Sequence, residues 1–238
     1  PMDHIDAFQD ALIIQLKNTI IGDPQSEGVR MGSLVGQTQR NDVRDQVSLL
    51  LEECELVYGS LDSVETIGAD SEIGAFMSPL LLRVDNPGSA SKVHDIEAFG
   101  PVSSLMPYDN ITDAVELAKR GKGSLCCSIT THDKAVATEF VRNAASMHGR
   151  ILVLDRECAK ESTGHGSPLP LLVHGGPGRA GGGEEMGGLR GIRHYMQRTA
   201  IQGHPSMLTA ITEQYQPGGA QPESEPHVFR KHFEELVV

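Results

Sequence analysis

The sequence predicts an α/β fold whose sheet is twisted and mainly parallel. The main observation is a regular alternation of helix and strand patterns between residues 110 and 154, which is typical of parallel strands joined by right-handed crossovers. A second observation is the apolar run of residues 78–84, which suits a buried strand and is too short to span a bilayer. A third is the composition, because 39% of the 238 residues are hydrophobic and 22% are charged, as in folded soluble chains.

Two helices and two strands are predicted in the first half of the chain. Asp3 is expected to cap a helix that ends before Gly22, because its side chain can accept a hydrogen bond from an unpaired backbone N–H. The apolar face of this helix consists of residues spaced three or four apart, namely Ile5, Phe8, Ala11, Leu12, Leu16 and Ile20. A second helix is predicted over 38–54 and strands over 55–58 and 77–84, whereas 93–107 is interpreted as irregular.

The second half is predicted to begin with alternating elements and to end in loops. Asn110 is expected to cap a helix that ends at Gly121, and a helix over 133–147 is expected to end at Gly149. Strands are predicted over 125–131, 151–154 and 194–202. Residues 175–191 are interpreted as a glycine-rich loop, 217–226 as a linker and 228–238 as a short amphipathic helix.

The charge balance and the cysteine content exclude several classes of function. A formal net charge of −12 without a basic patch argues against a nucleic-acid partner, and no membrane partner is expected. Four cysteines favour a reducing, cytosolic compartment over a secreted scaffold built on disulfides. The ten histidines include no helical pair and no Cys-x-x-Cys neighbour, so no metal site is predicted.

Two motifs in the second half could be active, and each has a simpler interpretation. Residues 176–181 match the pattern G-x-G-x-x-G, but no helix is predicted to start at the third glycine, so a plain loop is preferred over a dinucleotide site. Cys158 and His165 could form a nucleophile–base pair. Cys126 and Cys127 lie on a predicted strand and are interpreted as small core residues.

The segment Glu97–Val102 combines a carboxylate, an aromatic ring and a Gly-Pro turn. A fixed carboxylate beside a flat apolar ring could hold a sugar diol and the planar ring attached to it. The alternative is a simple turn with a packed phenylalanine.

This same segment resembles the E-x-F-G-P-V motif of the aldehyde dehydrogenases. Four further segments resemble motifs of that family in the same order, namely 22–24 with 31–34, 123–125, 174–189 and 194–200. Residues 160–170 and 174–183 are most similar to the PaaZ-type branch of bifunctional phenylacetate-degradation proteins. In that branch a hydratase domain of the MaoC type follows the dehydrogenase half.

The resemblance implies a catalytic-domain fragment that is inactive alone. It covers residues 1–203, and residues 204–238 would lead toward the hydratase domain. This branch oxidises the semialdehyde released when oxepin-CoA is opened, with NADP as cofactor, although NAD is possible. The nucleophilic cysteine, the glutamate base and most of the cofactor domain would lie upstream of Pro1, and none of the four cysteines here aligns with the nucleophile.

Within the chain the resemblance implies only supporting roles. Glu97 would bind the hydroxyl groups of the nicotinamide ribose, and Phe99 would pack against the nicotinamide. The substrate would be an aldehyde, expected to be a CoA thioester, and its candidate contacts are Lys160, His165, His174 and Arg179. Residues His194–Gln202 would form an oligomerisation strand that pairs with a neighbouring subunit in a homo-oligomer.

Two other classes of function stay open at this point. The chain could be a non-catalytic α/β scaffold that only oligomerises. It could also be a thiol hydrolase that uses Cys158 and His165.

Overall fold

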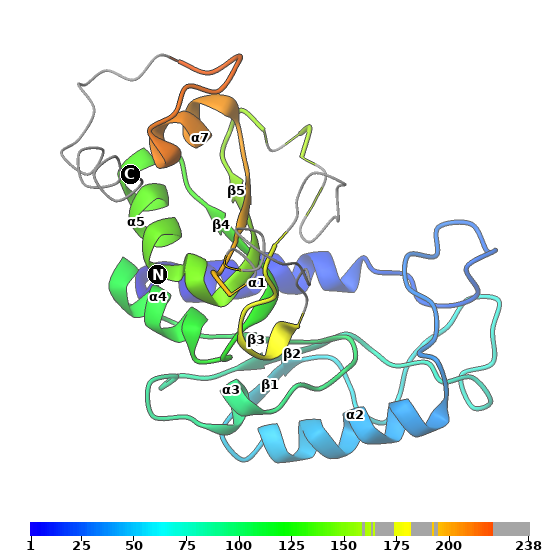
Figure 1. Cartoon of the computed structure of the whole chain (residues 1–238). Helices are drawn as coiled ribbons and strands as arrows, with labels where there is room; N and C mark the ends of the chain where they lie inside the picture. The colour runs from blue at the N-terminus through cyan, green and yellow to red at the C-terminus, as the bar shows by residue number, and fades with distance from the viewer. Residues whose placement is uncertain (159, 163, 165–173, 182–191, 193–194, 221–238) are drawn as a thin grey trace. The chain divides into compact units, whose positions relative to one another are not determined.

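The computed structural model describes residues 1–158, 160–162, 164, 174–181, 192 and 195–220 (Figure 1). The chain divides into two compact units, Pro1–Asp113 and Ala114–Val238, and each unit contains a three-stranded sheet with helices. The predicted α/β fold is therefore confirmed. In the described part of the chain, no helix combines the length and the apolar character needed to cross a membrane.

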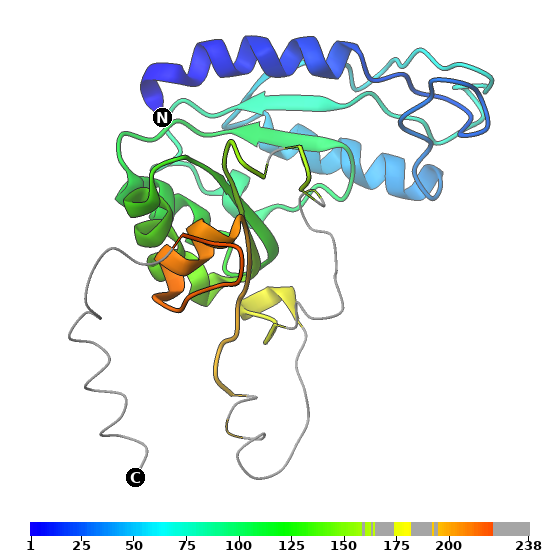
Figure 2. The ribbon, with the colours of Figure 1, turned by 90° about the horizontal axis from the view of Figure 1, so that it is seen from above.

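The first unit is a small sheet between two helices. Its elements are η1 (Met2–His4), α1 (Ile5–Lys17), α2 (Gln37–Leu50), β1 (Glu55–Tyr58), β2 (Leu80–Arg83), α3 (Lys92–Asp95) and β3 (Val102–Leu105). The strand order is β1-β2-β3, and β2 pairs antiparallel with β1 and parallel with β3. Figure 2 shows α1 and α2 on opposite sides of this sheet.

Strand β2 is buried on both faces, which explains why its sequence is a continuous apolar run. Leu80 packs in a cluster with Val43 and Val47 of α2, whereas Leu81 packs in a second cluster with Ile5 of α1. Because successive side chains of a strand point to opposite faces, neighbouring leucines can serve two different helices.

Several details of the first unit differ from the sequence prediction. Asp3 does not cap the first helix; His4 occupies the N-cap position and makes no capping side-chain bond. Phe8, Ala11 and Ile20 are exposed, because the buried face of the helix follows Leu12, Ile13 and Leu16 instead. The segment interpreted as irregular contains α3 and β3, and its strand forms through pairing with β2 although its sequence, V-S-S-L, is half polar.

The second unit has the predicted parallel alternation. Its elements are α4 (Ile111–Lys119, which begins at the end of the first unit), β4 (Ser124–Thr130), α5 (Lys134–Ala144), η2 (Ala145–Met147), β5 (His148–Leu154), η3 (Gly178–Ala180), β6 (Ala200–Gln202) and α7 (Pro205–Thr212). The strand order is β4-β5-β6, with both pairings parallel. Asp133 Oδ1 accepts hydrogen bonds from the N–H groups of Ala135 and Val136, which is the expected N-cap geometry.

In the second unit, the sequence prediction was wrong about where several elements begin or end. Gly149 does not end a helix but lies inside β5. After α4 the left-handed residues are Lys122 and Gly123 rather than Gly121. Of the described residues 195–202 of the predicted last strand, 200–202 form a strand, and this strand pairs with β5 of the same chain.

Helix α7 was not predicted. It begins with Pro205 and is capped by His204, it buries Met207 and Ile211, and it packs beside α5 (Figure 1). Residues 204–220 are thus part of the second unit. The predicted helix over 228–238 lies outside the described residues.

Replacement of Leu81 by alanine should destabilise the protein by about 2–5 kcal/mol, because a fully buried side chain of β2 is removed from a packed cluster. Chemical denaturation of the purified chain measures this loss. The control is Ile73→Ala, since Ile73 is 79% exposed, and its cost should stay within about 0.5 kcal/mol. Equal costs for the two variants would contradict the proposed core.

The stability of the protein should also fall as the pH drops below about 6.5 because of His148 in β5. Burial lowers the pKa of His148 from its ordinary value of 6.5, so the unfolded chain takes up a proton at a higher pH than the folded chain does. The stabilisation is fully present above 6.5 and is lost as the pH falls toward the lower folded pKa.

Denaturation midpoints of the wild type and of His148→Gln across this pH range test the effect, with the exposed His132→Gln as control. The His148 variant should lose part of the pH dependence while the control keeps it. An unchanged dependence in His148→Gln would show that other groups cause it.

Candidate functional site

The segment Glu97–Val102 is held in place by its small residues. Ala98 packs against the apolar cluster of Val43 and Leu80. The backbone turns tightly, since Gly100 N donates to Ala98 O at 2.7 Å and Val102 N donates to Gly100 O at 2.8 Å. A Cβ atom on Gly100 would lie 2.8 Å from Val43 Cγ2, so this close approach to α2 requires glycine.

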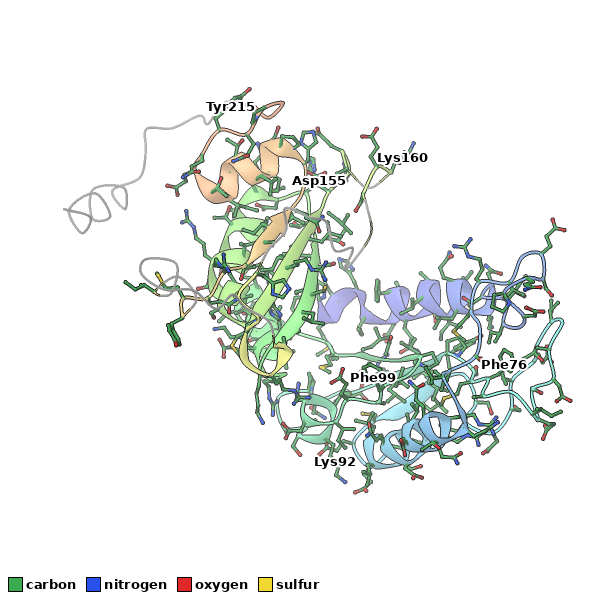
Figure 3. All side chains as sticks on the ribbon, turned by 45° about the vertical axis from the view of Figure 1, so that its right-hand side comes forward. Phe76, Lys92, Phe99, Asp155, Lys160 and Tyr215 are labelled. Atoms are coloured by element: carbon green, nitrogen blue, oxygen red, sulfur yellow. The ribbon has the colours of Figure 1, made fainter. Side chains whose placement is uncertain are left out.

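The side chains of Glu97 and Phe99 point away from the apolar cluster that holds Ala98. Exposure alternates along the segment, with Glu97 and Phe99 exposed and Ala98 between them partly buried. Phe99 is 72% exposed, and Figure 3 shows it beside α2 in the first unit. The backbone of Phe99 is fixed, because Gln39 Nε2 donates to its carbonyl at 2.7 Å.

The pair offers a carboxylate and a flat apolar surface on a fixed backbone. Within the described residues no hydrogen bond or ion pair occupies the Glu97 carboxylate, and a phenylalanine ring this exposed has a face available for packing. A carboxylate can accept hydrogen bonds from two neighbouring hydroxyl groups, and an aromatic face can pack against a second planar ring. The residues present therefore suit the ribose and nicotinamide of a dinucleotide cofactor.

The candidate substrate residues lie in the second unit. Lys160 and Arg179 are exposed, and Figure 3 shows Lys160 near Asp155 at the end of β5. His174 is partly buried, and its ring lies so close to Gly149 that a Cβ there would be 2.6 Å from Nδ1. Among the described residues no hydrogen bond or ion pair joins Lys160, His174 and Arg179, and His165 lies outside the described residues.

In the G-x-G-x-x-G segment, the glycines allow the backbone to pack closely against the backbone at Lys122. Arg179 N donates to Lys122 O at 3.0 Å, and a Cβ on Gly178 would lie 2.0 Å from that same carbonyl. The short η3 helix there has three residues, whereas a pyrophosphate site requires the start of a longer helix. This geometry agrees with a glycine-rich loop.

Within the described residues, the polar contacts of the Cys158 sulfur are with backbone groups. The sulfur lies 3.5 Å from Asp155 N and 3.7 Å from Val153 O, so it faces backbone groups of the turn after β5. Burial opposes ionisation of Asp155, but hydrogen bonds from the N–H groups of Cys158 and Glu157 lower its pKa below the ordinary value. The carboxylate of Asp155 therefore stabilises this turn.

Cys54 and Cys127 also differ from a nucleophile. Burial raises the pKa of Cys127 to about 11 and raises that of Cys54 as well, whereas an attacking thiol needs a lowered pKa. Cys126 and Cys127 are half-buried on β4, so they are less enclosed than core residues. In the described part of the chain no three His, Cys, Asp or Glu residues form a group that could hold a metal ion.

Comparison with known proteins identifies close relatives of the sequence. A family model described as "Aldehyde dehydrogenase family" matches residues 2–201. "Protein MaoC" of Klebsiella aerogenes is 50% identical over 207 residues, which are 87% of this chain and 60% of that protein. The "3,4-dehydroadipyl-CoA semialdehyde dehydrogenase" of Aromatoleum evansii is 41% identical over 171 residues, which are 72% of this chain and 33% of that protein.

Solved structures share the fold at lower identity. A double mutant of betaine aldehyde dehydrogenase from Staphylococcus aureus, in complex with NAD+, matches with a TM-score of 0.64 and 20% identity over 81% of this chain and 35% of that one. Aldehyde Dehydrogenase C from Pseudomonas syringae, in complex with NAD+ and octanal, matches with a TM-score of 0.62 and 24% identity over 82% and 36%. The chain thus spans less than two thirds of these relatives.

Replacement of Gly100 by alanine should cost about 1–3 kcal/mol of stability, because the new methyl group would overlap the stiff side chain of Val43. Gly88→Ala is the matched control, since no atom lies within 4 Å of a Cβ there. Denaturation of both variants measures the difference. If Gly100→Ala were as stable as Gly88→Ala, the close approach to α2 would be refuted.

Proposed function

Because the chain belongs to the aldehyde dehydrogenase family, we propose that it is part of the catalytic domain of an enzyme that oxidises a CoA-linked semialdehyde to the carboxylate. The observation on which this depends most is the exposed pair of Glu97 and Phe99 on a backbone fixed by α2. The name of the Aromatoleum relative supports a CoA-linked semialdehyde as substrate. The Klebsiella relative is named "Protein MaoC", which agrees with the proposed link to a MaoC-type hydratase domain.

The chain's own contribution is to bind and orient the cofactor. The Glu97 carboxylate would accept hydrogen bonds from the ribose hydroxyls, and the Phe99 ring would pack against the nicotinamide. Fixing this ring relative to the aldehyde lowers the entropic cost of reaching the reactive geometry. The cofactor, NADP or alternatively NAD, supplies the acceptor for the hydride that leaves the aldehyde carbon.

The nucleophile is proposed to lie upstream of Pro1. None of the four cysteines matches the family's nucleophile in sequence, and the described surroundings of Cys54, Cys127 and Cys158 do not activate a thiol. The isolated chain should therefore not oxidise aldehydes.

Substrate and subunit contacts are proposed for the second unit. Lys160, His165, His174 and Arg179 would contact the anionic CoA thioester, since cationic and hydrogen-bonding groups suit phosphates. Residues 194–202 would pair with a neighbouring subunit, and β6 has β5 on one side in the sheet order. The pathway would be phenylacetate degradation in the cytoplasm, with the semialdehyde from oxepin-CoA as substrate.

The experiment that tests this function measures the absorbance of reduced nicotinamide with NADP and a medium-chain aldehyde. We expect activity from a chain extended upstream through the proposed cofactor domain and none from the 238-residue chain. In the extended chain, Glu97→Gln and Phe99→Leu should each lower kcat/KM about tenfold or more, because a charged hydrogen-bond acceptor or a packing surface is lost.

Cys158→Ala in the extended chain is the control and should keep full activity. Activity of the short chain that disappears in Cys158→Ala would overturn the proposal in favour of a thiol mechanism. An inactive extended chain would favour a scaffold that only oligomerises.

A further inference from the structure

A polar pocket lies beside α2 in the first unit. Its volume is about 260 Å³, and it is enclosed by α2 and by the two loops 60–64 and 71–78. Phe76, which lines it, lies near the end of the unit where α2 begins (Figure 3). The polar groups of its lining include two arginines and four serines, namely Arg40, Arg44, Ser60, Ser63, Ser71 and Ser78.

The two guanidinium groups are fixed to the wall of the pocket by single hydrogen bonds. Arg40 Nη1 donates to Gly74 O at 3.1 Å, and Arg44 Nε donates to Leu61 O at 2.9 Å. Because the two arginines are four residues apart on a helix, they lie on the same face one turn apart. Each guanidinium has five N–H donors, so most of the donors are not used by these two bonds.

Arg40 also has a donor that no other described residue satisfies. Its Nε atom is shielded from solvent and has no hydrogen-bond partner. A shielded donor without a partner costs about 1–3 kcal/mol, and a charged group costs more.

The acidic residues of the lining do not neutralise the arginines by direct contact. Asp62 and Glu72 also line the pocket and are exposed. Among the described residues, no ion pair joins either carboxylate to Arg40 or Arg44. The hydroxyl of Ser71 has no hydrogen bond within the described part of the chain. The hydroxyl groups of Ser60, Ser63 and Ser78, in contrast, take part in local hydrogen bonds.

We propose that this pocket binds a phosphate group. Guanidinium groups bind phosphate oxygens in pairs of parallel, charge-assisted hydrogen bonds, and Arg40 and Arg44 together present such donors from one helix face. The hydroxyl of Ser71 supplies a further donor. An apolar ligand would leave these groups without partners and would be rejected by the pocket.

The phosphate could come from free inorganic phosphate or from a phosphate of a coenzyme A thioester. The second source rests on the proposed function, because the proposed substrate is linked to CoA. The site itself rests only on the geometry of the first unit.

Calorimetric titration of the purified 238-residue chain tests the proposal with three probes: inorganic phosphate, coenzyme A and dephospho-coenzyme A. Saturable binding is expected for phosphate, and Arg44→Gln and Ser71→Ala should weaken it, the arginine variant by about tenfold. The matched control is Arg30→Gln, an exposed position in the same unit with the same loss of charge, which should bind phosphate as the wild type does. Circular dichroism of each variant reports whether it is folded.

The three probes separate the two sources. If coenzyme A binds at least about tenfold tighter than dephospho-coenzyme A, and if this difference in affinity is lost in Arg44→Gln, the site is assigned to the CoA-linked substrate. Equal binding of phosphate in folded wild type and Arg44→Gln, or no saturable binding of phosphate or coenzyme A, would overturn the site. Neither result affects the predicted roles of Glu97 and Phe99, because those roles are tested separately by the dehydrogenase activity of the extended chain.

Discussion

The contact of Val43 with the backbone at Gly100 is the constraint on which the candidate site depends. Val43 is part of the cluster that attaches α2 to Leu80 of β2, and a side chain on Gly100 would not fit against it. Because Ala98 joins the same cluster, the side chains on either side of it face outward. The core of the first unit therefore determines where Glu97 and Phe99 point, although neither residue belongs to the core.

The elements that the sequence predicted well are those whose patterns are local. Strand β1 was predicted with its observed bounds, and the β4-α5-β5 alternation was predicted within one to three residues at most ends, because local patterns of apolar residues define it. Strand β3 could not be predicted, since V-S-S-L becomes a strand only by pairing with β2. Helix α7 was missed because eight residues after a loop give a short periodic pattern, and its burial against α5 decides its structure.

The candidate site was predicted in part. The residues Glu97 and Phe99 were identified through a family resemblance, and the alternation of exposure around Ala98 gives that assignment a physical reason. The pocket of Arg40 and Arg44 was not foreseen. Two arginines four residues apart on a helix are usually a solvated face, and only the loops 60–64 and 71–78, which are distant in sequence, enclose them.

A crystal structure of the upstream-extended chain with NADP bound would show directly whether Glu97 and Phe99 contact the nicotinamide riboside. We expect the Glu97 carboxylate to lie within hydrogen-bond distance of the nicotinamide ribose hydroxyls and the Phe99 ring to pack against the nicotinamide. We also expect the segment Glu97–Val102 to keep its position against Val43. A bound cofactor whose nicotinamide contacts neither residue would contradict the claim that α2 and its cluster serve to position them.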